Sequence, residues 1–407
     1  MNRYRMQFAP QVWKPNINPT LVRWLRAFRI RHQQRTQRLT EVLVHGADQL
    51  RAAVAGNCGV LLTPNHPSHA DPFTIYMAGD AAGTPLHIMA TWHVFHNQNR
   101  LLRWILSGHG CFSVDREAND IGAFRQAVSI LESKIQPLVI FPEGEIYHCN
   151  DRVTPFREGA AAIAVAAARK AARKIVCVPC ALRYRYVEDP TTSLTAIMGE
   201  LERSIFWRRQ DHLSLDRRIY RFAEALLAVK ELEYFERTEN GPLPPRIERL
   251  GSHILSTVEE AHGLINQHAC LPERVKSARK TILEEIQNVS QSNSPADIKK
   301  LNDQLDDLFL VVQSFSYPGG YVAASPTIER MAETLDKFEE DVLNRETATI
   351  RAKRTAIVTI GDPVEVASAK GRKGYVGELT KQLEDQVQQM LDKTAPESTL
   401  VDRVEAG

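Results

Sequence analysis

Short apolar runs alternate with helix-like segments through the first half of this chain, and this alternation constrains its fold most. We expect buried strands at 59–63, 85–90, 111–114, 137–141 and 175–182. We expect helices between them at 72–78, 119–133 and 158–173. Strands separated by helices are typical of an α/β domain in which helices cover a mixed sheet. We therefore predict an α/β fold for these residues.

One strand-to-helix junction carries a histidine and an aspartate on either side of a short loop. His66 follows the first apolar run, and Asp71 with Pro72 is typical of a helix N-cap followed by proline in the first turn. Pro67 disfavours an α conformation at His66, so we expect the histidine in the loop. A helix cap and a loop histidine without chemistry also fit these residues.

The same pair suits proton transfer. Histidine has an unperturbed pKa of about 6.5 and so exchanges a proton near neutral pH. The carboxylate of Asp71 can hold one ring nitrogen of His66, which leaves the other to deprotonate an alcohol. His66, His69 and Asp71 are alternatively metal ligands, but they match no familiar zinc spacing. We predict no metal.

Three further blocks follow this junction in a fixed order. They are Gly-Cys-Phe-Ser-Val-Asp-Arg at 110–116, Phe-Pro-Glu-Gly-Glu at 141–145 and an apolar run around Pro179. With Asn-His-x4-Asp at 65–71 they make four blocks in register. In this the chain resembles the glycerolipid acyltransferase superfamily, whose type member acylates 1-acylglycerol-3-phosphate. The resemblance covers roughly residues 40 to 185.

The resemblance implies a role for each block. His66 would be the general base and Asp71 its orienting partner, while Pro179 matches the block associated with the acyl-donor side. The donor would be a thioester, on coenzyme A or on acyl carrier protein, and no cofactor is implied. A purely structural role for Pro179 is the alternative.

Three residues match the positions that bind the glycerol and phosphate of the acceptor, namely Arg116, Glu143 and Gly144. An arginine fork suits a phosphate, and a glutamate accepts hydrogen bonds from a polyol. A surface ion pair for Arg116 and a turn-capping role for Glu143 remain open.

The third block departs from the pattern of many relatives, which continue it as Thr-Arg-Ser. This chain has Glu145 at the first of those positions, followed by Ile and Tyr. Arg152 and Arg157 are candidates to replace the missing arginine, beside structural roles for both. A different lysolipid or an amino-lipid hydroxyl is therefore the alternative acceptor.

Composition and net charge limit the kinds of partner and the cellular location that we expect for this chain. The chain has 407 residues with 43% apolar and 25% charged side chains, which is ordinary for a globular protein. Its net charge of +2 argues against nucleic acid as a partner. No run approaches the roughly 18 apolar residues that span a bilayer, and 1–10 lacks the apolar centre of a signal peptide. We expect a cytoplasmic protein that meets lipid at the inner face of the membrane, with reduced cysteines.

The N-terminal segment 1–45 has the character of an interfacial helix. Residues 1–51 carry ten Lys or Arg and only two acidic residues. Apolar residues at helical spacing follow a helix start at Pro19, namely Leu21, Trp24, Leu25 and Phe28. A basic amphipathic helix of this kind suits an anionic lipid surface, and packing on the core is the alternative. A weaker interfacial candidate is 204–209.

After residue 190 the pattern changes to long amphipathic helices, and apolar β character returns at 356–366. That return resembles the last strand of the same superfamily, which is followed by a terminal helix. We therefore expect five parts: a basic segment 1–45, an acyltransferase core 46–190, a helical insertion 191–349, a closing strand and helix 350–395, and a flexible tail 396–407. Two domains in series is the alternative.

The function predicted from the resemblance is transfer of a fatty acyl group to the hydroxyl of a glycerophospholipid precursor similar to 1-acylglycerol-3-phosphate, in phospholipid biosynthesis. A thioesterase-like hydrolase and a non-catalytic membrane-associated scaffold are the alternatives. The sequence leaves the oligomeric state open.

Overall fold

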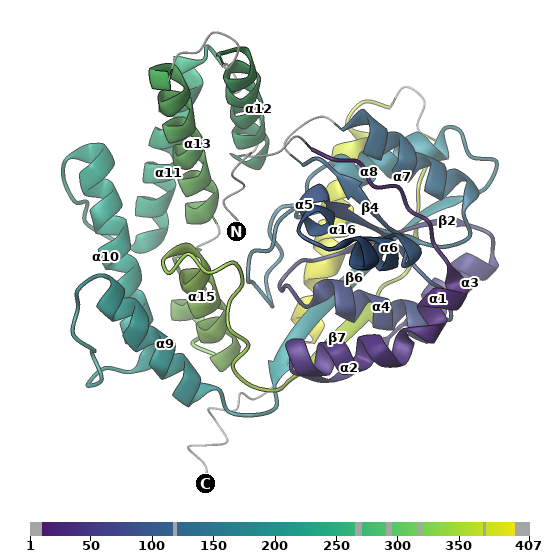
Figure 1. The fold of residues 1–407 in the computed structure, drawn as a ribbon, viewed down its shortest axis with the longest axis horizontal. Coiled ribbons are helices and arrows are strands. Elements are labelled where there is room, and N and C mark those ends of the chain that lie inside the picture. The colour runs from purple at the N-terminus through teal and green to yellow at the C-terminus, as the bar shows by residue number, and fades with distance from the viewer. Residues whose placement is uncertain are drawn as a thin grey trace. The chain divides into compact units, whose positions relative to one another are not determined.

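The computed structural model describes residues 10–116, 120–264, 271–289, 295–315, 319–368 and 372–394. The chain divides into two compact units (Figure 1). One comprises Thr191–Thr349, and the other comprises Arg5–Pro190 together with Ile350–Gly407. The predicted tail 396–407 lies outside the described residues.

The second of these units holds all the strands of the described residues. They are β1 (Leu39–His45), β2 (Gly59–Pro64), β3 (His87–Thr91), β4 (Cys111–Val114), β5 (Leu138–Val139), β6 (Ile175–Tyr186), β7 (Arg354–Ile360) and β8 (Val364–Glu365). Its helices are α1 (Pro19–Trp24), α2 (Arg26–Thr36), α3 (Ala47–Ala55), α4 (Asp71–Ala82), α5 (Trp92–His96), α6 (Arg100–Gly108), α7 (Ile121–Ser133), α8 (Gly159–Ala168) and α16 (Tyr375–Lys393).

The strands form one eight-stranded sheet in the order β1-β7-β6-β2-β5-β3-β4, with β8 beside β6. Neighbouring strands run parallel except that β6 pairs antiparallel with β7 and β8. Parallel strands need crossover connections, and the helices between them supply these. The predicted α/β fold with a mixed sheet is confirmed.

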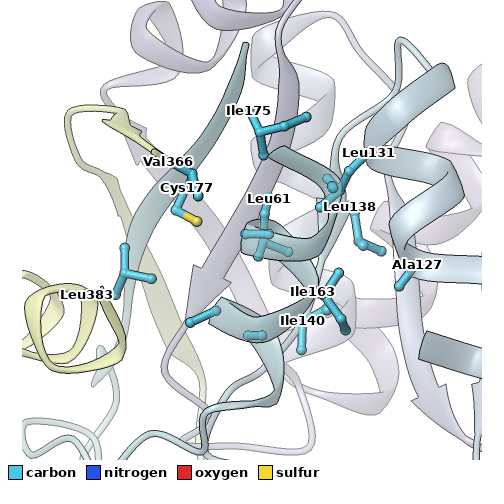
Figure 2. Close-up of a cluster of buried hydrophobic side chains, with 14 of the residues drawn as sticks. Leu61, Ala127, Leu131, Leu138, Ile140, Ile163, Ile175, Cys177, Val366 and Leu383 are labelled. Atoms are coloured by element: carbon cyan, nitrogen blue, oxygen red, sulfur yellow. The ribbon is translucent and has the colours of Figure 1, made fainter. Parts of the chain in front are cut away.

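The central strand β2 is buried on both faces, and its alternate residues serve two cores. Leu61 packs with α7, α8 and α16 on one face (Figure 2). Val60 and Leu62 pack with α3 and α4 on the other. Because side chains alternate along a strand, this run must be apolar at every position, as it is in sequence. Cys177 and Cys180 on β6 are both buried, and neither forms a disulfide.

The predicted elements exist but several bounds differ. The strand expected at 137–141 is only Leu138–Val139, because the chain turns at Pro142 toward Gly144, which has a left-handed backbone (φ +77°). The helix expected at 158–173 ends at Ala168. Arg173 instead donates a hydrogen bond to the carbonyl of Leu131, 2.6 Å away, at the end of α7. The edge strand β1 was not predicted, since its partner β7 comes from the far end of the sequence.

The other unit is helical. Its elements are α9 (Thr191–Ser204), α10 (Leu215–Phe235), α11 (Leu243–Ala261), α12 (Leu271–Val289), α13 (Pro295–Phe315), α14 (Tyr321–Ala324) and α15 (Ile328–Asp341). Leu250, Ile254 and Leu308 lie in its apolar core. On α10, Val229 is exposed, whereas Glu231 is buried and accepts two hydrogen bonds from the guanidinium of Arg246.

The helical unit lies in sequence between two strands that are neighbours in the sheet. β6 ends at Tyr186, and β7 begins at Arg354 and pairs with β6 from Cys180 to Tyr186. Among the described residues, no helix combines the length and apolar character that a bilayer crossing requires.

Candidate functional site

Loops that follow parallel strands carry the predicted site residues. His66 comes two residues after β2, Arg116 two residues after β4, and Glu143 shortly after β5. β2, β5, β3 and β4 are consecutive parallel neighbours, so their carboxyl ends lie at one edge of the sheet. Ligands in open α/β sheets bind at this edge. The topology thus brings together residues that are far apart in sequence.

His66 is fixed by contacts to its ring and to its backbone. Its Nδ1 lies 2.7 Å from Oδ2 of Asp71. The ring stacks on Phe141, with 4.2 Å between centroids, and the His66 backbone N–H donates to Oε1 of Glu143 at 3.0 Å. The side chain stays 16% exposed, and Nε2 makes no hydrogen bond within the described part of the chain. Nε2 is therefore the nitrogen available to a substrate.

Asp71 is fully buried and its carboxylate accepts three hydrogen bonds. Oδ2 accepts from Nδ1 of His66 and from the backbone N–H of Ser68 at 3.0 Å, and Oδ1 accepts from the Tyr184 hydroxyl at 2.5 Å. The predicted N-cap role of Asp71 is wrong. α4 begins at Asp71 itself, with Ala70 in the cap position, because the carboxylate faces the loop and His66.

Tyr184 is a site residue that the sequence analysis missed. It lies on β6. The neighbouring strand β2 ends at Pro64, opposite Cys180, and β6 continues past that point to Tyr186. The Tyr184 hydroxyl lies 2.9 Å from Oγ1 of Thr74 as well as 2.5 Å from Asp71. Burial, and then the Asp71 carboxylate, raise the pKa of Tyr184 well above its ordinary value. The phenol therefore stays protonated and donates to Asp71. No local sequence signal marks a contact across this separation.

Two asparagines continue the pairing of β6 after β2 ends. The side-chain amide of Asn65 donates to the Leu182 carbonyl (3.0 Å) and accepts from its N–H (2.7 Å). Asn150 makes the same two contacts with Tyr184, both at 2.6 Å. Buried backbone groups need such partners, and here the side chains replace a missing strand. Asn65 thereby anchors the residue before His66.

Glu143 is buried, and both of its carboxyl oxygens contact the protein. Oε1 accepts from the His66 N–H, and Oε2 is hydrogen-bonded to the Thr154 hydroxyl. Burial raises the pKa of Glu143 to about 8, although the hydrogen bonds from Thr154 and His66 oppose that rise. The predicted contact of Glu143 with an acceptor remains a prediction. Its observed contacts hold the loop of His66.

Gly144 makes room for an arginine. Its backbone has φ +77°, which favours glycine, and a Cβ there would lie 2.7 Å from Cζ of Arg157. The backbone N–H of Arg157 donates to the Pro142 carbonyl at 2.9 Å. A side chain at residue 144 would displace this guanidinium from the loop.

Arg116 is held by the same loop. Its Nη1 donates to the Gly144 carbonyl at 2.6 Å and lies 3.1 Å from Oε2 of Glu145. Arg116 therefore forms an ion pair with Glu145, which lies on the loop after a different strand. Arg152, the other candidate to replace the missing arginine, is exposed.

Two candidates remain, Pro179 and His69. Pro179 is buried within β6, at the place where the partner of β6 changes from β8 to β7. Its carbonyl accepts the N–H of Gly361 at 2.9 Å, which fits the structural alternative, and its acyl-donor role remains a prediction. His69, considered as a metal ligand, has its ring 5.7 Å from that of His148.

Comparison with known proteins is consistent with this site. Residues 41–183 match the family model described as Acyltransferase. That range contains the histidine, the aspartate and each of the other predicted site residues. No curated protein sequence matches the chain significantly. The resemblance predicted from the four blocks is confirmed.

Glu143→Gln tests the protonation of the buried carboxyl. The unfolded chain ionises Glu143 near its ordinary pKa of 4.5, whereas the folded protein keeps the proton up to about pH 8. The folded form therefore binds more protons within this window and loses stability as pH rises through it. Glutamine does not titrate. We expect the free energy of unfolding of the variant, relative to wild type, to rise by on the order of 1 kcal/mol per pH unit across the window.

Denaturant unfolding at intervals between these two pH values measures that difference. Glu158→Gln, at an exposed carboxylate, is the matched control and should show no comparable trend. A difference for Glu143→Gln that is constant with pH would contradict the raised pKa.

Proposed function

We propose that this chain transfers a fatty acyl group from a thioester to a lipid hydroxyl. Its residues 41–183 match the Acyltransferase family model, so the chain is an acyltransferase. The observation that carries this proposal is the His66–Asp71 pair, 2.7 Å apart, with Nε2 unbonded. The donor is acyl-coenzyme A or acyl carrier protein. The acceptor is a glycerophospholipid precursor, and the reaction belongs to phospholipid biosynthesis.

The proposed reaction moves one proton through His66. Nε2 takes the proton of the acceptor hydroxyl as its oxygen attacks the thioester carbonyl. The tetrahedral intermediate then collapses, the carbon–sulfur bond breaks, and the leaving thiolate takes the proton back from Nε2. The acceptor is itself the nucleophile, so no acyl-enzyme forms and we expect sequential rather than ping-pong kinetics.

Asp71 and Tyr184 support this step from behind the ring. The carboxylate accepts from Nδ1, which keeps Nε2 unprotonated before reaction and stabilises the imidazolium formed during it. Tyr184 donates to the other carboxylate oxygen, 2.5 Å away. Asp71 is completely buried, so without these donors its charge would be strongly destabilised. Tyr184 is thus a positioning residue for the base.

His66→Ala tests the chemistry. We expect acyl transfer to fall by at least about 100-fold, because general-base catalysis of this kind contributes roughly 100- to 10,000-fold. Labelled acyl-thioester is incubated with and without a lysolipid acceptor, and products are separated. Unchanged circular dichroism and thermal midpoint show that the variant is folded.

The same product analysis separates the alternatives. A hydrolase releases fatty acid at the same rate without acceptor, and a scaffold forms no acylated product. Transfer that persists in His66→Ala would remove the basis of the proposed mechanism. His69→Ala, at the neighbouring histidine of the same loop, is the matched control and should retain transfer.

We also propose that the protein meets its lipid substrate as a peripheral protein on the cytoplasmic face of the membrane. Trp24 and Phe28 are 83% and 62% exposed on α1 and α2, beside the exposed Arg23. Tryptophan and phenylalanine next to arginine suit an anionic lipid interface. Arg29, by contrast, is buried in an ion pair with Asp80 of α4, so it attaches α2 to the core.

A second exposed apolar surface adjoins the first. The Asn18 N–H, just before α1, donates to the Gly108 carbonyl at the end of α6, 2.8 Å away. α6 exposes Leu101 and Trp104. Exposed aromatic residues on two joined helices support membrane contact here. Phe206, in the weaker candidate segment, is also exposed.

Phe28→Ala tests the membrane contact. We expect weaker sedimentation with vesicles containing anionic lipid, by about 3- to 10-fold in partition coefficient, since roughly 1 kcal/mol of apolar transfer energy is lost. Ile135→Ala is the matched control, because Ile135 is similarly exposed but follows α7, which covers the opposite face of the sheet. Equal binding of the two variants would contradict the proposal.

A further inference from the structure

A carboxylate lies among the arginines that the acceptor would meet. The loop after β5 carries Glu143, which holds the His66 backbone, and two residues later Glu145. By the resemblance described above, Glu145 is the first residue at which this block departs from the superfamily pattern. Its surroundings therefore bear on which headgroup the site accepts.

Glu145 is ion-paired and mostly buried. Its Oε2 lies 3.1 Å from Nη1 of Arg116, and the two side chains are 16% and 19% exposed. Burial alone would raise the pKa of Glu145, but the guanidinium groups of Arg116 and Arg157 outweigh it and bring the pKa below its ordinary value. The carboxylate is therefore ionised at neutral pH.

The charges of this group do not cancel. Within the trio formed by Arg116, Arg157 and Glu145, two positive charges face one negative charge, so the trio has a net charge of +1. Burial keeps Glu143 largely protonated at neutral pH, so it adds little. Part of the donor capacity of Arg116 is already used by the Gly144 carbonyl and by Glu145.

A phosphomonoester and a phosphodiester differ in how well their negative charge matches a single positive charge in the site. A phosphomonoester carries roughly −1.5 to −2 charges at pH 7. It would compete with Glu145 for the same guanidinium and would be repelled by it, in a site of low exposure where such repulsion is weakly screened. A phosphodiester carries a single negative charge and matches what remains. An uncharged headgroup would gain no attraction from the net charge of the trio.

We propose that the acceptor is a lysophospholipid with a phosphodiester headgroup, and that Glu145 discriminates against a phosphomonoester such as 1-acylglycerol-3-phosphate. This rests on the proposed acyl transfer to a lipid hydroxyl. It makes Glu145 a specificity-determining residue of that same site.

Three acceptors with one acyl chain, presented in neutral detergent micelles, test the proposal on the full-length protein. They are lysophosphatidylglycerol, 1-acylglycerol-3-phosphate and monoacylglycerol, with one labelled acyl-thioester as donor. We expect kcat/KM to be at least about 10-fold higher for the phosphodiester than for either other acceptor, which corresponds to about 1.4 kcal/mol.

Glu145→Gln then tests the residue. The amide keeps a hydrogen-bond acceptor for Arg116 without the charge. We expect the ratio of kcat/KM for the phosphomonoester to that for the phosphodiester to rise about 10-fold, by the same conversion. Glu158→Gln makes the same charge change at an exposed position and should leave the ratio unmoved. Glu145→Thr is a second variant if the glutamine form does not fold.

The outcomes separate the two proposals. Wild-type preference for the phosphomonoester or for monoacylglycerol overturns the specificity proposal and leaves acyl transfer standing, as does an unmoved ratio in folded Glu145 variants. Thioester hydrolysis without transfer to any of the three acceptors overturns the proposed function, and this inference with it.

Discussion

The site depends on one buried carboxylate and the hydrogen-bond donors that surround it. Asp71 has no solvent exposure, and it accepts hydrogen bonds from Nδ1 of His66, the Ser68 backbone and the Tyr184 phenol. An ionised carboxylate in such a place is tolerated only when its oxygens are satisfied. Those same contacts orient the imidazole. The stability of the loop and its chemistry therefore have a common cause.

The sheet assembles these groups from distant parts of the chain. β2 delivers His66, β5 delivers Glu143, and β6 extends past the end of β2 to deliver Tyr184. Along Cys180–Tyr186, the edge of β6 that faces away from β2 pairs with β7 (Figure 1). β7 follows the helical unit in sequence. Tyr184 is thus held by Asp71, which precedes the helical unit in sequence, and by its strand partner Ala356, which follows it.

Local patterns predicted the parts of this arrangement that are local in sequence. The strand runs, the His66–Asp71 spacing and the Phe-Pro-Glu-Gly block follow from short-range residue preferences and from the superfamily resemblance. Tyr184 could not be predicted, since its partner Asp71 is 113 positions away and nothing near either residue signals the pairing. The Arg116–Glu145 ion pair was also missed, because it needs the order of β4 and β5 in the sheet.

The tautomer of His66 tests the central claim most directly, because the mechanism requires an unprotonated Nε2 next to the acceptor hydroxyl. Nitrogen NMR of protein labelled at histidine reports which ring nitrogen carries the proton, and His66→Gln identifies the signal. The account predicts a neutral ring with the proton on Nδ1, shared with Asp71, and no proton on Nε2. A proton on Nε2 of the neutral ring would contradict it.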